Sequence, residues 1–101
     1  MPPDIVDVLE HIQEEAENIA EDTAGLTYDA FMADRRRRYA VERSFLTIGE
    51  AVRRLRRHAP DIAERLTDHD AIVAFRNALI HEYDDISYPS VWRAVQVTLP
   101  V

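Results

Sequence analysis

Residues 34–58, DRRRRYAVERSFLTIGEAVRRLRRH, decide the fold class because their apolar side chains recur at helical spacing. The recurring positions lie three or four residues apart and are Val41, Phe45, Ile48, Val52 and Leu55. We predict one long helix over Asp34–His58, closed by Pro60, whose ring cannot continue a helix. Gly49 lies inside it at a cost of about 1 kcal/mol relative to alanine, which indicates that a packed neighbour approaches its backbone closely.

Helical periodicity continues on both sides of this stretch. We predict a first helix over Asp4–Asp22, a helical turn over Tyr28–Met32, a third helix over Asp68–His81, and a fourth that Ser87 caps, with Pro89 in its first turn. The residues expected to face the core are Ile5, Val8, Leu9, Ile12, Ala16 and Ile19 in the first helix, Ile72, Phe75 and Leu79 in the third, and Val91, Trp92 and Val95 in the fourth. The sequence therefore predicts an all-α fold, an up-and-down bundle of four main helices plus a short helical turn, with residues 1–101 as one domain.

Composition excludes several classes of site. The chain contains no cysteine, which excludes disulfides, thiolate catalysis and cysteine-ligated zinc. No run approaches the roughly 20 apolar residues that a membrane helix needs, and the start, Met1–Asp4, lacks a basic region followed by an apolar one. We therefore expect a cytoplasmic protein with no membrane contact. Adjacent acids such as Glu14 and Glu15 point apart on a helix, so we also expect no metal site.

Residues 76–83, RNALIHEY, contain the side chains that best support chemistry. RNA supplies its own nucleophile, the 2′-hydroxyl, so metal-free cleavage needs an acid or base near neutral pH and a cation for the developing phosphorane charge. His81 suits the first role because histidine titrates near pH 6.5, and Arg76 suits the second because a guanidinium binds phosphate oxygens as a fork. Asn77 suits a supporting role, in which it orients His81 or binds phosphate. Spacing alone leaves a structural interpretation open, with Arg76 as a salt-bridge partner and His81 stabilised by the helix dipole.

Helix geometry adds a constraint on this pair. On a regular helix Arg76 and His81 point about 140° apart. One straight helix therefore does not bring both side chains onto one phosphate. Local unwinding near His81, the reach of long side chains, or a second copy of the chain would bring them together.

The motif resembles that of the HEPN superfamily, specifically the HepT-like toxin ribonucleases, in its Arg-Asn pair, its four residues between Arg76 and His81, and its tyrosine at Tyr83. Arg53 and His58 repeat the spacing without that context. Further segments resemble the same family across nearly the whole chain: Leu26–Asp34, Ala40–Arg43, Ile48–Ala51, Val91–Arg93 and Leu99–Pro100.

This resemblance implies a dimeric, metal-independent endoribonuclease of a toxin–antitoxin pair, with RNA rather than DNA as substrate and no cofactor. Arg76 and His81 would be catalytic. Tyr83 would be adenylylated by a cognate minimal nucleotidyltransferase antitoxin, which places a bulky negative phosphate beside the catalytic pair. A non-enzymatic alternative remains open, in which the helical domain binds a nucleotide or phosphate through the same residues and partners a nucleotidyltransferase.

Charge is segregated along the chain, whose formal net charge is −7. Residues 1–34 carry ten acidic residues and no basic one, whereas residues 35–57 carry nine arginines against two glutamates. Two arginine clusters, Arg35–Arg38 and Arg53–Arg57, lie on the predicted long helix. Three roles stay open for them: contact with RNA, contact with an acidic partner or with the acidic segment 1–34, and solvation.

Overall fold

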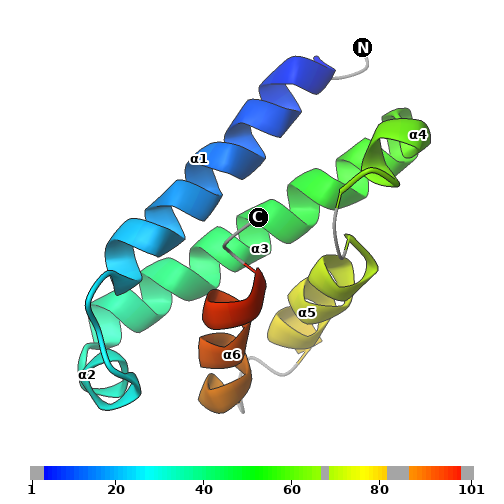
Figure 1. Cartoon of the computed structure of the whole chain (residues 1–101). Coiled ribbons are helices and arrows are strands. Elements are labelled where there is room, and N and C mark those ends of the chain that lie inside the picture. Colours follow the sequence, from blue (N-terminus) through cyan, green and yellow to red (C-terminus); the bar gives the residue numbers. More distant parts are fainter. Residues whose placement is uncertain (1–3, 67–68, 82–86, 99–101) are drawn as a thin grey trace.

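The longest helix, α3, packs against α1, α2, α4 and α5, and α6 contacts α1 (Figure 1). The computed structural model describes residues 4–66, 69–81 and 87–98. Its helices are α1 (Ile5–Thr23), α2 (Tyr28–Ala33), α3 (Arg35–His58), α4 (Pro60–Ala63), α5 (His69–His81) and α6 (Tyr88–Thr98). In this view α1 runs alongside α3, and the shorter helices α5 and α6 lie on the other side of α3. The predicted all-α bundle is confirmed, and no strand occurs within these three ranges.

Side-chain caps fix where the first three helices begin. Asp4 accepts a hydrogen bond from the Val6 amide over 2.9 Å, and the Thr27 hydroxyl accepts one from the Ala30 amide over 3.1 Å. Asp34 does the same for α3, since its Oδ1 accepts from the Arg37 amide over 3.1 Å. These residues satisfy amides that have no partner inside the helix, as short polar side chains commonly do at a helix start.

The apolar stripe predicted for α3 forms the centre of the core. Its five residues, Val41, Phe45, Ile48, Val52 and Leu55, are all at most 5% exposed. They pack with buried residues of the other helices, namely Val8, Ile19, Phe31, Ala63, Val73, Leu79, Val91 and Val95. The stripes predicted for α1 and α6 therefore face the core, as expected.

Two details differ from the sequence-based expectation. Pro60 does not simply end α3, because after Ala59 it occupies the first turn of a further short helix, α4, where its missing N–H is tolerated. In α5, Val73 is buried together with Leu79, whereas Ile72 and Phe75 are only partly buried at the edge of the core. The face that α5 presents to the core is thus turned slightly from the predicted one.

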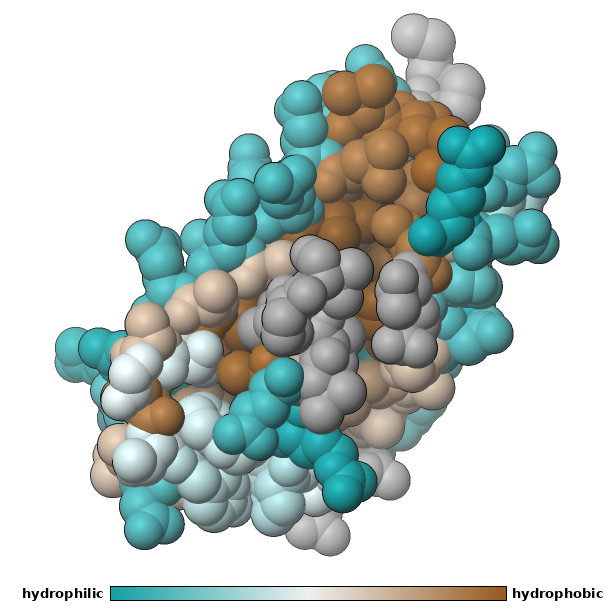
Figure 2. Space-filling view, viewed as in Figure 1, coloured by the Kyte–Doolittle hydropathy of each residue, from teal (hydrophilic) through white to brown (hydrophobic). Residues whose placement is uncertain are grey.

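None of the helices in the described ranges combines the length and the apolar character that crossing a membrane requires. The space-filling view in Figure 2 shows charged and polar residues over much of the visible face, with an apolar region between α1 and α4. Ile5, Leu9 and Ile62 are partly buried residues of the apolar cluster at this end of the bundle.

A buried carboxylate lies where α3 meets α6. Glu42 is 8% exposed, and its Oε1 has no hydrogen-bond partner in the described part of the chain. Arg38 lies over the ring of Tyr88 at 5.2 Å, beside the same carboxylate. Burial raises the pKa of the Glu42 carboxyl, and the Tyr88 hydroxyl and the Arg38 charge offset only part of that effect.

The raised pKa of Glu42 leads to a prediction about stability. A carboxyl whose pKa is higher in the folded than in the unfolded state stabilises the fold less as pH rises through the folded value. The parent loses this stabilisation as pH rises, whereas glutamine does not titrate. We therefore expect the free energy of unfolding of Glu42→Gln, relative to that of the parent, to increase from about pH 4 to about pH 8. Urea unfolding at both pH values measures this gain. The exposed Glu64→Gln serves as control, and an equal change in both variants would contradict the assignment.

Candidate active site

The contact between α5 and the middle of α3 is centred on Gly49 and Arg76. A β-carbon placed on Gly49 would lie 2.2 Å from the Cβ of Arg76 and 2.5 Å from its Cγ. Non-bonded carbon atoms normally approach to about 3.5–4.0 Å, so no other residue fits at position 49 without moving α5. The close neighbour that the sequence indicated for Gly49 is confirmed. It is the stem of Arg76, a residue of the predicted site.

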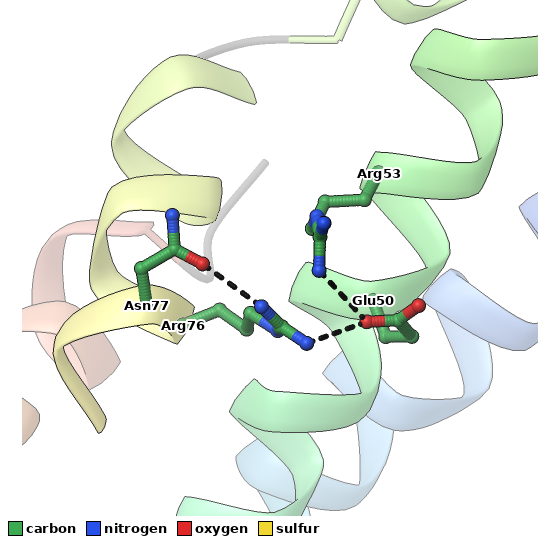
Figure 3. A network of polar contacts seen from close by, with 4 residues as sticks. All are labelled: Glu50, Arg53, Arg76 and Asn77. Atoms are coloured by element: carbon green, nitrogen blue, oxygen red, sulfur yellow. Dashed lines mark hydrogen bonds and ion pairs between the residues drawn. The ribbon is translucent and has the colours of Figure 1, made fainter. Parts of the chain in front are cut away.

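The guanidinium of Arg76 is held by two acceptors, one from each helix (Figure 3). Its Nη2 donates to Glu50 Oε2 over 2.8 Å, and its Nη1 donates to Asn77 Oδ1 over 2.9 Å. Arg53 contacts the same Glu50 oxygen over 3.5 Å, from the next turn of α3. The Arg76 side chain is 18% exposed. Arg76 is therefore largely buried, paired and fixed in direction.

An open hollow of about 320 Å³ lies beside this network. Four of its lining residues come from α3 at intervals of three or four, which places them in one stripe along the helix: Arg43, Thr47, Glu50 and Arg54. Leu46 also lines it, and Arg76 and Ile80 line it from α5. Among the described residues, three arginines against one glutamate give the hollow a positive lining, in a chain whose net charge is −7.

His81 lies at the end of the same helix but in a different direction. It is the last residue of α5, and its side chain is exposed. Because α5 stays helical as far as His81, the angle of about 140° between Arg76 and His81 applies. Among the described residues, no hydrogen bond or ion pair joins His81 to Arg76 or Asn77. The predicted modification residue, Tyr83, lies outside the described ranges.

Glu50 was not predicted as a residue of the site. In the sequence it is one of two acids in the arginine-rich segment and part of the stretch Ile48–Ala51. The available signal was its place directly after Gly49, since a long side chain that flanks a point of close helix contact can reach the neighbouring helix. The sequence does not show which helix packs at Gly49, so the position of Glu50 does not identify Arg76 as its partner.

The two arginine clusters differ in their surroundings. In the first cluster, Arg37 pairs with Asp34 over 3.0 Å and donates to the Asp22 carbonyl over 3.0 Å, while Arg38 donates to the carbonyl of Met32. These two arginines thus contact the acidic N-terminal segment, one of the roles left open.

In the second cluster, Arg56 pairs with Asp70 and His69 of α5, and only Arg53 and Arg54 lie beside the hollow or Glu50. Arg54 lines the hollow directly. In the described ranges, no three side chains of histidine, aspartate or glutamate are grouped to hold a metal ion.

Comparison with known proteins assigns this chain to a family. The family model described as "Ribonuclease HepT-like" matches residues 12–101. A protein of Caldanaerobacter subterraneus named "Putative RNase" is 32% identical over 91% of this chain and 81% of its own length. A "Putative RNase" of Methanocaldococcus jannaschii is 33% identical over 96% of this chain and 88% of its own. A "Probable ribonuclease HepT" of Thermococcus cleftensis is 31% identical over 93% and 84%. No solved structure gave a significant match.

The contact at Gly49 predicts the effect of adding one methyl group. We expect Gly49→Ala to force α5 away from α3 and to lower the free energy of unfolding, because overpacking of this kind costs about 1–3 kcal/mol. This cost exceeds what the higher helix propensity of alanine adds to stability. Chemical unfolding measures the loss. Gly25→Ala is the matched control, because at φ +73° it strains the backbone while meeting no atom within 4 Å. If Gly49→Ala were as stable as the parent or more stable, that result would contradict the close contact between Gly49 and Arg76.

Proposed function

This chain belongs to the family of HepT-like ribonucleases, and from that premise we propose that it is a metal-independent endoribonuclease toxin of a toxin–antitoxin pair. RNA is the substrate, the enzyme is a homodimer in the cytoplasm, and a cognate minimal nucleotidyltransferase is the antitoxin. The observation that carries the proposal is the guanidinium of Arg76, held in a fixed direction at the edge of a positively lined hollow. A fixed cation beside further cations is what a phosphodiester in its transition state requires.

The reaction uses the 2′-hydroxyl of the substrate as nucleophile. The 2′-oxygen attacks the adjacent phosphorus, the bond from phosphorus to the 5′-oxygen breaks, and the products are a 2′,3′-cyclic phosphate and a 5′-hydroxyl. His81 takes the proton from the 2′-hydroxyl or gives one to the departing 5′-oxygen. Arg76 stabilises the charge on the phosphorane oxygens with the N–H groups that Glu50 and Asn77 leave free.

The hollow supplies binding beyond the reacting phosphate. Arg43 and Arg54 lie 11 residues apart on the same stripe of α3, which separates them by roughly 16 Å along the helix axis. Arg76 enters the hollow from α5. Arginines arranged in this way contact phosphates on either side of the one being cleaved.

The dimer supplies the second half of the site. In one chain, Arg76 points into the hollow between α3 and α5, and the exposed His81 lies about 140° around α5. A two-fold axis near the end of α5 places the motifs of both copies along one cleft. Ile80 supports such an interface, because it is a large apolar residue that lines the hollow and is 40% exposed.

The control point of the proposed toxin is Tyr83, two residues beyond His81. Transfer of AMP from ATP to its hydroxyl forms a phosphodiester and releases pyrophosphate. The added group is bulky and negatively charged, so it competes with RNA phosphate for the cationic hollow. This assignment depends on the family motif.

Cleavage of a mixed RNA pool in EDTA tests the catalytic assignment. We expect the parent to cut RNA and leave cyclic-phosphate ends, His81→Ala to lose about 10²- to 10⁴-fold, and Arg76→Ala about 10²- to 10³-fold. His58→Ala is the matched control, because it removes an exposed histidine from the end of another helix. No cleavage by parent protein with an unmodified Tyr83 would contradict the ribonuclease. It would instead favour a module that binds phosphate without cutting it.

Incubation with ATP and a minimal nucleotidyltransferase from the same genome tests the control point. We expect the parent to gain the mass of one AMP and to lose cleavage activity, and Tyr83→Phe to gain none and stay active. Tyr39→Phe is the control, since Tyr39 is 57% exposed and available for non-specific transfer. Modification that persists in Tyr83→Phe would refute this assignment.

A further inference from the structure

Glu50 is the one acid among the described residues that line the hollow, and it contacts the proposed catalytic arginine directly. An acid at a site for a polyanion weakens binding, so its presence there requires a reason. We propose that Glu50 is a positioning residue, which holds the guanidinium of Arg76 in the direction that the reaction needs. This inference depends on the proposed role of Arg76.

The geometry divides the task of fixing Arg76 into two parts. Gly49 fixes the stem, because the Cβ and Cγ of Arg76 lie on the α3 backbone where a side chain would otherwise be. The bonds beyond Cγ stay free to rotate. Asn77 lies next to Arg76 on α5 and accepts from Nη1, whereas Glu50 accepts from Nη2 across the gap between helices. Two acceptors on opposite sides define the plane of the guanidinium, and the charged one forms the stronger bond.

Holding the two helices together does not require Glu50. A second ion pair between α3 and α5 joins Arg56 to Asp70. Phe45 and Phe75 stack edge to face between the same helices, with ring centroids 5.1 Å apart. Loss of Glu50 therefore leaves α5 seated on α3 and frees only the end of the Arg76 side chain.

The charge of Glu50 and its hydrogen bond have opposite effects on the reaction. The negative charge repels RNA phosphate and raises KM, while the hydrogen bond orients Arg76 and raises kcat. Glu50→Ala removes both, so kcat falls and KM falls with it or stays unchanged. Glu50→Gln removes the charge but keeps an oxygen that accepts from Arg76, so it restores most of kcat.

Single-turnover cleavage at varied RNA concentration measures this split. We expect Glu50→Ala to lower the rate at saturating RNA by about 10- to 100-fold, which is the effect of displacing a catalytic group by about 1 Å. We expect Glu50→Gln to recover most of the parental rate. Asp70→Ala is the matched control, because it breaks the other ion pair between α3 and α5 with the same change in charge. A parental rate at saturating RNA in Glu50→Ala would overturn the proposal.

A second measurement separates this inference from the proposed function. Nitrogen-15 NMR of the arginine side chains reports rotation of the Arg76 guanidinium in the free protein, whether or not the protein cuts RNA. We expect slow rotation in the parent and in Asp70→Ala, and fast rotation in Glu50→Ala. Unchanged rotation in Glu50→Ala would show that Glu50 does not position Arg76. If the parent did not cleave RNA but the guanidinium rotated fast in Glu50→Ala, the proposed ribonuclease activity would be refuted. The inference that Glu50 positions Arg76 would still hold.

Discussion

The arrangement of the site depends on the direct packing of α5 on the backbone of α3 at Gly49. Because position 49 has no side chain, the stem of Arg76 occupies the place of a Cβ. This depth of packing brings the guanidinium within 2.8 Å of Glu50. At an ordinary distance between helices, the same arginine would extend toward solvent and its direction would be undefined. Burial of 82% of the side chain, with two fixed acceptors, converts a flexible residue into an oriented cation.

Helix α3 serves two purposes at once, which constrains most of its length. Its buried stripe, from Val41 to Leu55, forms the core with buried residues of all the other helices. A second stripe, from Arg43 to Arg54, lines the hollow against α5. Since a helix turns by about 100° per residue, the two stripes alternate along the sequence. The mixture of arginine and apolar residues in this segment follows from the two faces.

Local pattern predicted much of the fold, and it failed where the answer depended on packing between helices. The stripe of α3 is visible in sequence because burial requires apolar residues at helical intervals. Pro60 was ambiguous, since a proline ends one helix and starts another equally well, and α4 was therefore missed. For the site, Gly49 and Arg76 were identified separately, but their contact was not. The partner of a long side chain such as Glu50 depends on which helix lies opposite, and the sequence does not state that.

The direction of His81 limits what a single chain can do. On one regular helix, the oriented Arg76 and the exposed His81 point about 140° apart, because α5 stays helical through His81. Fixing Arg76 so firmly removes the option that the arginine bends toward the histidine. The remaining freedom lies with the side chain of His81. The homodimer proposed above would meet this constraint, because a two-fold axis near the end of α5 can bring the histidine of a second copy toward Arg76.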